Sequence, residues 1–99
     1  MTDWFKDRRQ EFIEATFLQF GIINTQQIMD QFQISRPLAS GDIQTYLKNS
    51  KHSIMYDVHA KCYVLIKSER TALRDEINER YANTFKYLAK QENKNDDSV

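Results

Sequence analysis

The chain has 99 residues, of which 40% are hydrophobic and 28% charged, and its 14 basic and 14 acidic residues give a formal net charge of zero. A chain of this length closes one hydrophobic core, and the composition is ordinary for a globular protein. Two glycines and one proline exclude collagen-like and linker-type sequences and favour helix. No apolar run approaches the roughly 20 residues of a membrane span, so we expect no membrane contact.

Two further features of the sequence concern the compartment. Acidic residues near the start of the chain argue against a secretory signal peptide, so we expect a cytoplasmic protein. The single cysteine, Cys62, cannot form an internal disulfide or hold a structural zinc alone, and its strand-like surroundings predict a small buried hydrophobe.

The charges are unevenly distributed along the chain. Between residues 36 and 67, five lysines and arginines stand against two aspartates, and both histidines lie in the same segment. The acidic excess lies on either side of it. A neutral total therefore conceals a basic segment, which forms a nucleic-acid surface if its side chains meet on one face.

The first predicted element is an amphipathic helix over residues 3–20, which Gly21 should end. Apolar residues recur in it at three- and four-residue intervals, which is the period of one helix face. The residues expected to form its buried stripe are Phe5, Phe12, Ile13, Thr16, Phe17 and Phe20.

Two shorter helices should follow. The second begins at an Asn24 or Thr25 cap and runs to about residue 33. Ser35 caps the third, and Pro37 lies in its first turn, where a missing N–H costs nothing. The residues expected to be buried in these two helices are Ile28, Phe32, Ala39, Ile43, Tyr46 and Leu47. The opposite face of the third helix is polar and almost free of acids.

After residue 53 the pattern becomes strand-like. Residues 54–56 and 62–66 are rich in β-branched and aromatic side chains, and a five-residue loop joins them, which predicts a two-stranded ribbon. A last helix should run to about residue 91. The fold is therefore expected to be mainly helical with a small β-hairpin: a winged helix-turn-helix DNA-binding domain over residues 1–67, a long C-terminal dimerisation helix over residues 68–92 and a disordered tail over residues 93–99.

Fragments of the sequence also resemble a known family. Residues 23–25, 32–35 and 39–43, with Tyr46, and then residues 54–57 and 61–64, are similar to the DeoR-like winged helix at the N-terminus of WYL-domain transcriptional regulators. The resemblance covers roughly residues 8 to 66. It implies a sequence-specific repressor or autoregulator that binds a palindromic operator as a homodimer and controls phage-defence or mobile-element genes. The chain ends soon after the wing, so we expect no WYL domain, no ligand sensing and no small-molecule ligand.

The third helix is expected to read bases in the major groove of double-stranded DNA. The family usually carries a polar or basic residue where Gly41 stands, so one contact is expected to be absent. Leu38 either contacts a thymine methyl or packs under the wing. Asp42 should be structural, paired with a cation or with N–H groups of the second helix. The predicted base-reading residues are Arg36, Leu38, Ser40 and Gln44.

The second helix and the wing are expected to hold phosphates. The start of the second helix can bind phosphate, cap itself, or do both. Arg8 and Arg9 can add a contact from the first helix. The predicted phosphate and wing residues are Arg9, Asn24, Thr25, Gln26, Lys48, Lys51, His59 and Lys61.

The stripe of the last helix either folds back on its own domain or pairs with a second copy, and its length favours dimerisation. The predicted dimerisation residues are Leu73, Ile77, Tyr81, Phe85 and Leu88. Because His52 and His59 lack zinc-ligand spacing and no phosphate loop or nucleophile–base pair is present, we expect no metal, no cofactor and no enzyme. The alternative function is a winged-helix adaptor that binds other proteins.

Overall fold

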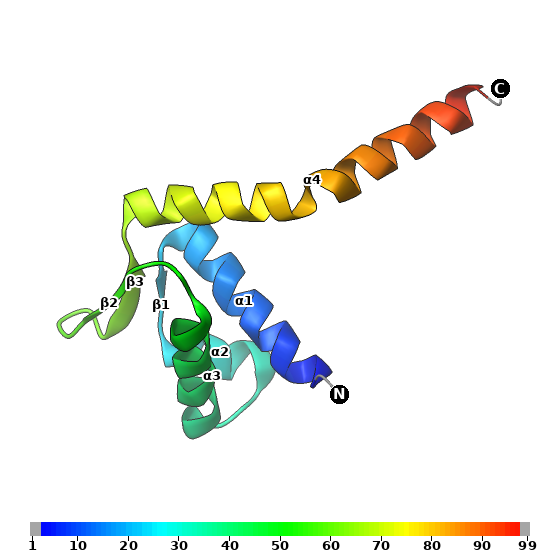
Figure 1. Ribbon diagram of the computed structural model, residues 1–99. Coiled ribbons are helices and arrows are strands. Elements are labelled where there is room, and N and C mark those ends of the chain that lie inside the picture. Colours follow the sequence, from blue (N-terminus) through cyan, green and yellow to red (C-terminus); the bar gives the residue numbers. More distant parts are fainter. Residues whose placement is uncertain (1–2, 98–99) are drawn as a thin grey trace.

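The computed structural model describes the backbone of residues 3–97 and the side chains of residues 3–82. It confirms the mainly helical fold with a small antiparallel sheet (Figure 1). The elements in chain order are α1 Trp4–Phe20, β1 Ile22–Ile23, α2 Thr25–Phe32, α3 Arg36–Asn49, β2 Ile54–Asp57, β3 Cys62–Leu65 and α4 Lys67–Asp97.

Side-chain caps start the first three helices where the sequence predicts. The Asp3 carboxylate accepts from the backbone N–H groups of the first turn of α1, and Ser35 does the same for α3. Asn24 and Gln27 form a reciprocal capping box at the start of α2, with both hydrogen bonds at 2.9 Å. Gly21, with a left-handed φ of 76°, ends α1. Each cap satisfies N–H or C=O groups that have no partner inside the helix.

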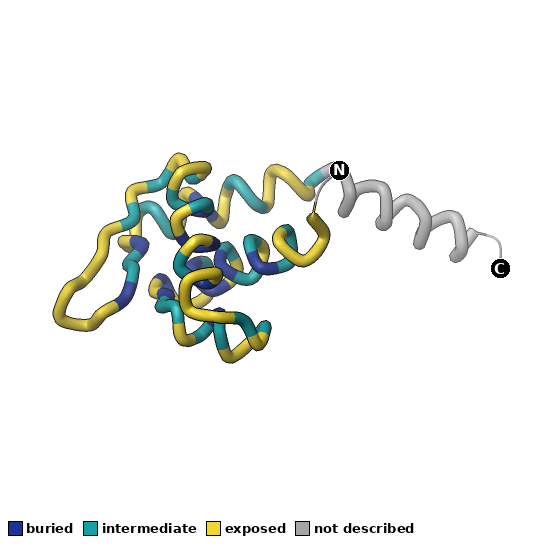
Figure 2. Tube along the Cα trace, turned by 90° about the horizontal axis from the view of Figure 1, so that it is seen from below, coloured by how far each residue is buried: buried dark blue, intermediate teal, exposed yellow. Residues whose placement is uncertain are grey.

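The core lies where α1, α2 and α3 meet the sheet and the first turns of α4 (Figure 2). Phe5 and Phe20 do not belong to it: they are 67% and 61% exposed, because they lie at the two ends of α1, beyond the elements that cover its middle. Cys62 is buried, as predicted. The fully buried residues are Ile13, Phe17, Ile23, Ile28, Ala39 and Ile43.

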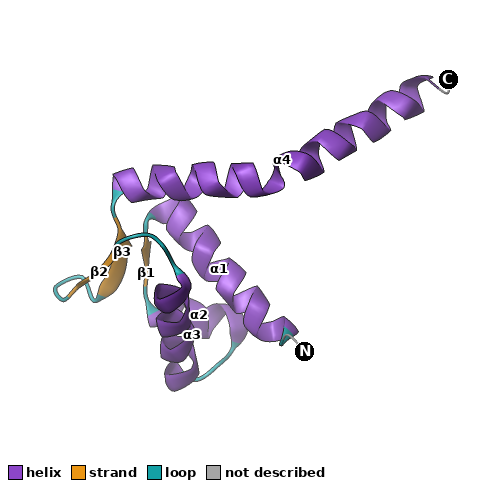
Figure 3. Ribbon diagram, in the orientation of Figure 1, coloured by secondary structure: helices purple, strands orange, loops and turns teal. Residues whose placement is uncertain are grey.

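The sheet has one strand more than the predicted ribbon (Figure 3). β3 is central, pairing antiparallel with β2 on one side and with β1 on the other. The Leu65 N–H also donates to the Gly21 carbonyl at 2.8 Å, which extends the pairing with the segment that follows α1. β1 therefore ties the base of the wing to the helical part of the domain.

A buried ion pair joins α1 to α3. Arg9 Nε donates to Asp42 Oδ2 at 2.6 Å and Arg9 Nη2 donates to Oδ1 at 3.3 Å. The two residues are 8% and 2% exposed. Gln10 adds a hydrogen bond to the Asp42 carbonyl. The expectation that Asp42 pairs with a cation is confirmed. The predicted phosphate contact of Arg9 is wrong, because its guanidinium is held inside the domain.

α4 begins by packing on its own domain. Leu73 is 2% exposed within the core, and Ile77 packs against that core. Arg70 donates to the backbone carbonyls of Leu18 and Gln19 at the end of α1. Leu73 is therefore wrong as a dimerisation residue, because its side chain is already buried within one chain.

The rest of α4 extends away from the domain (Figure 1). The helix continues to Asp97, past the predicted end near residue 91 and into the segment predicted as a tail. Tyr81 is 46% exposed. The side chains of Phe85 and Leu88 lie outside the described residues.

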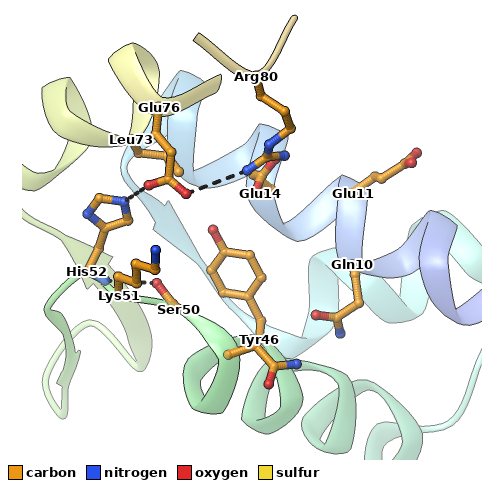
Figure 4. Close-up of a pocket in the computed structure, with 11 residues that line it drawn as sticks. Gln10, Glu11, Glu14, Tyr46, Ser50, Lys51, His52, Leu73, Glu76 and Arg80 are labelled. Atoms are coloured by element: carbon orange, nitrogen blue, oxygen red, sulfur yellow. Dashed lines mark hydrogen bonds and ion pairs between the residues drawn. The ribbon is translucent and has the colours of Figure 1, made fainter. Parts of the chain in front are cut away.

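Charged side chains hold α4 over a hollow between α1, the end of α3 and residues 50–52 (Figure 4). Arg80 Nη1 lies 3.2 Å from Glu14 Oε1, and its Nη2 lies 3.6 Å from Glu76 Oε1. The ring of His52 lies between two carboxylates, with Nδ1 2.9 Å from Glu69 Oε2 and Nε2 2.9 Å from Glu76 Oε2. We call these five residues the α4 clamp.

Histidine donates from both ring nitrogens only when protonated. Burial opposes the charge on His52, but the hydrogen bonds and negative charges of Glu69 and Glu76 outweigh it, so the pKa of His52 lies above its ordinary value of 6.5. The clamp therefore binds the imidazolium form most tightly.

The ion pair between α1 and α3 generates the first prediction. Asp42→Asn leaves the Arg9 guanidinium buried without a counter-charge, so we expect the free energy of unfolding in urea to fall by about 3 kcal/mol. Arg8→Met is the matched control, because Arg8 pairs with Glu11 on the surface and such pairs contribute at most about 1 kcal/mol. Equal losses in the two variants would contradict the structural role of the buried pair.

The α4 clamp generates the second prediction. A folded-state pKa above the unfolded value adds stability that is complete below the unfolded pKa and is lost as pH rises through the folded pKa. We therefore expect the chain to lose stability as the pH rises above the ordinary histidine pKa of 6.5, and His52→Gln to lose less over the same interval. Urea unfolding at several pH values measures the stability of the wild-type chain and of the His52→Gln variant. A pH dependence that is the same in the two proteins would show that His52 is not its source.

Candidate nucleic-acid interface

α2 and α3 are joined by the three residues 33–35, and Gln33 turns the chain with a left-handed φ of 54°. The starts of the two helices are also linked. Arg36 Nη1 donates to Thr25 Oγ1 at 2.8 Å, and Nη2 lies 3.4 Å from Gln26 Oε1. Arg36 thus has a structural contact at the surface, and its remaining N–H groups can still donate to a ligand.

The outward face of α3 carries no acidic side chain. Asp42 is the only acid in the helix, and it points inward to Arg9. A Cβ on Gly41 would meet nothing within 4 Å, so the middle of this face is open. Ser40 is half-buried. The exposed residues of α3 include Arg36, Pro37, Leu38, Gly41, Gln44 and Lys48.

A hollow lies between α3, the start of α2 and the wing, and we call it the α3–wing hollow. Five predicted contact residues line it, from three separate parts of the chain: Asn24, Thr25, Arg36, Ser40 and Lys61. Tyr56 and Tyr63 complete the lining. Gln44 borders it through a hydrogen bond to the Tyr63 hydroxyl at 3.1 Å. The fold therefore brings three of the predicted base-reading residues and three of the predicted phosphate-holding residues to one surface.

The two tyrosines were not among the predicted site residues. They are directly opposite each other in the β2–β3 register, and their rings pack edge to face with centroids 4.8 Å apart. Aromatic residues in a strand pattern are ordinarily packing residues, so the sequence pattern indicated only the loop cations as contacts. The signal that could have found them is the strand pairing, because the hairpin register places both rings on the face of the wing toward α3.

The turn of the wing, residues 58–61, carries two of the predicted contacts. Asp57 Oδ1 accepts from the backbone N–H groups of His59 and Ala60 at 2.9 Å and 3.1 Å. Lys61 closes the turn with a left-handed φ of 54°. His59 and Lys61 are both exposed. Asp57 pairs with Cys62, so the loop is one residue shorter than predicted.

Other predicted residues lie outside the α3–wing hollow. Leu38 lies on the opposite flank of α3, in a shallow hollow beside Asp3 and Lys6 of the α1 start. The alternative that Leu38 packs under the wing is therefore wrong. Lys51 lines the hollow beneath the α4 clamp. Gln26 is exposed at the start of α2 and donates to Asp30.

The described part of the chain offers two other observations that bear on function. It contains no group of three or more His, Cys, Asp and Glu side chains placed to hold a metal ion. None of its helices combines the length and the apolarity that crossing a membrane requires. The α3–wing hollow itself presents amide, hydroxyl, guanidinium and ammonium groups, a set that is suited to phosphates and base edges.

The order and packing of these elements define the class. A second helix that packs against an exposed third helix, followed by an antiparallel hairpin beside that third helix, is a winged helix-turn-helix. The family model of the BrxR transcriptional regulator winged helix-turn-helix domain matches residues 6–87. The chain therefore belongs to this family. The resemblance to winged helices of transcriptional regulators is confirmed.

Curated relatives agree with this assignment. The chain is 34% identical over 88 residues to a protein of Pseudomonas aeruginosa named DNA-binding transcriptional repressor CapW, a match that covers 89% of this chain. Proteins of the same name from Stenotrophomonas maltophilia and Escherichia coli strain KTE188 are 29% and 32% identical over 88% and 89% of the chain. The matched region spans only 29% of each of these relatives.

Proposed function

We propose that this chain binds double-stranded DNA in a sequence-specific manner and acts as a transcriptional repressor. The observation that carries the proposal is the acid-free outward face of α3, with the α3–wing hollow beside it. A major groove about 12 Å wide admits one α-helix, and α3 lies at the end of the domain away from α4, free to enter it (Figure 1). The names of the CapW relatives support the same function.

We assign the residues of the interface to two sets of contacts, one with base edges and one with phosphates. Base edges are read from α3 by Arg36, Ser40 and Gln44, with glutamine suited to adenine, and by Leu38 against a thymine methyl on the other flank. Phosphates are held by the start of α2 and by cations at the end of α3 and on the wing. This second set comprises Asn24, Thr25, Gln26, Lys48, Lys51, His59 and Lys61.

Repression follows from occupancy. A protein seated on a promoter excludes other proteins from the same DNA, which requires no reaction and no cofactor. The function requires the same compartment as DNA, in agreement with the predicted cytoplasmic location. Kinship to WYL-domain and DeoR-like regulators, and control of phage-defence genes, stay predictions from the resemblance.

The homodimer is the second part of the proposal. Two copies joined through the part of α4 beyond the domain present two α3 helices, and a spacing of about 34 Å matches successive turns of the major groove on a palindromic operator. Two half-sites also raise affinity through effective concentration. Since Leu73 and Ile77 are occupied within the chain, the pairing rests on Tyr81, Phe85 and Leu88.

The alternative, a winged helix that binds proteins, has one observation in its favour. Trp4 and Phe5 at the start of α1 are 60% and 67% exposed, with ring centroids 5.1 Å apart. These aromatics lie outside the α3–wing hollow, so the two functions make different demands on the surface of α3.

Gly41 provides the sharpest test of DNA binding. A Cβ there has no atom within 4 Å, and both glutamate and glutamine are better helix formers than glycine, so both variants should fold. Gly41→Glu places a carboxylate against the DNA, and we expect at least about tenfold weaker binding than with Gly41→Gln, in mobility-shift assays at low salt. Equal binding by the two variants would show that α3 does not face DNA, which favours the adaptor.

The proposed homodimer can be tested by measuring the molecular mass of the protein in solution. Light scattering of the full chain should give twice the mass of one chain, and Phe85→Asp should reduce this toward one chain because a carboxylate opposes apolar pairing. Circular dichroism checks that the variant remains helical. A wild-type mass of one chain at the concentration that saturates DNA would refute the dimer while leaving DNA binding intact.

A further inference from the structure

Gln44 connects the two parts of the interface. Its side-chain amide Nε2 lies on the exposed face of α3 and donates to the hydroxyl of Tyr63, on the central strand of the sheet, at 3.1 Å. The Tyr63 ring is itself packed edge to face against Tyr56. An exposed glutamine on a helix ordinarily samples many rotamers, whereas this one is tied to a half-buried ring.

The hydrogen bond to Tyr63 uses only one of the polar groups of the Gln44 amide. A glutamine side chain has two N–H donors and a carbonyl oxygen that accepts. A bidentate contact with adenine takes one N–H, directed to N7, and the oxygen, which accepts from N6. The hydrogen bond to Tyr63 therefore needs only the second N–H, which a contact with adenine does not use. By this count of donors and acceptors, one glutamine side chain can make both contacts.

Order before binding has a measurable consequence. Immobilising a rotamer-rich side chain on binding opposes affinity, and a side chain that is already held avoids most of that cost. The benefit appears only at the base that the side chain reads, because phosphate contacts made elsewhere are the same for every sequence.

We propose that Tyr63 is a positioning residue for sequence recognition: its hydroxyl holds the Gln44 amide in place and so sharpens the choice of base at one position of each half-site. The proposal rests on the proposed DNA-binding function and deepens it. Tyr63 acts through Gln44, and the wing thereby contributes to specificity as well as to phosphate binding.

The experiment begins with selection of bound duplexes from a random pool by the wild-type chain, which defines the preferred sequence. Gln44→Ala then identifies the base pair whose preference depends on Gln44. Tyr63→Phe removes the hydroxyl and keeps the ring packed on Tyr56. We expect it to reduce the preference at that same base pair by roughly two- to tenfold, with preferences elsewhere unchanged.

A matched control and a double variant complete the design. Tyr46→Phe removes a hydroxyl from a tyrosine that lines the hollow beneath the α4 clamp, outside the α3–wing hollow, and should leave the preference at the Gln44 position unchanged. The double variant of Gln44→Ala and Tyr63→Phe should show the same preference as Gln44→Ala alone, because the hydroxyl then has nothing to position. Thermal unfolding checks that all variants are folded.

Each other result overturns the proposal in a distinct way. If Tyr63→Phe weakens binding to all sequences alike, its hydroxyl contacts the DNA backbone instead. If Gln44→Ala keeps every base preference, the bond is a structural tie between α3 and the wing. If Tyr63→Phe selects as the wild type does, positioning fails while DNA binding stands. If the wild-type chain selects no sequence, the proposed function fails first and this proposal with it.

Discussion

The buried ion pair of Arg9 and Asp42 joins α1 to α3 and, together with the buried apolar residues of α3, fixes the rotation of that helix. An α-helix turns by about 100° per residue, so the rotation that directs Asp42 inward also fixes which side chains face outward. Asp42, the one carboxylate of α3, is directed to Arg9 and away from the surface that we assign to DNA. The same contact therefore holds α1 to α3 and keeps the reading face free of negative charge.

This arrangement explains how a chain of zero net charge presents a surface suited to DNA. Four acids of α1 and α4 form ion pairs away from that surface: Glu11 with Arg8, Glu14 with Arg80, Glu69 with His52, and Glu76 with both Arg80 and His52. Lys61 and Arg36, by contrast, line the α3–wing hollow. What steers a polyanion is the local distribution of charge on a face, and the sum over the chain says little about it.

Local signals in the sequence were sufficient for much of the fold. The caps at Asn24 and Ser35 act within one helical turn, so they could be predicted from neighbouring residues. Contacts between distant segments could not: Arg9 and Asp42 are 33 positions apart, and Gln44 and Tyr63 are 19 apart. β1 has only two residues, too few to show alternation. The stripe of α4 has the same period whether it packs within one chain or between two, so Leu73 was misassigned.

The α4 clamp connects the fold to the proposed assembly. Arg80, Glu14 and His52 fix where α4 leaves the domain, across a hollow from the C-terminal end of α3 (Figures 1 and 4). In the proposed homodimer, the angle at which α4 leaves sets the distance between the two α3 helices, and DNA accepts only distances close to its helical repeat. A group of surface ion pairs adds little to stability on its own. Its larger effect is geometric, because a small rotation at the clamp is multiplied along α4 into a displacement of the partner domain.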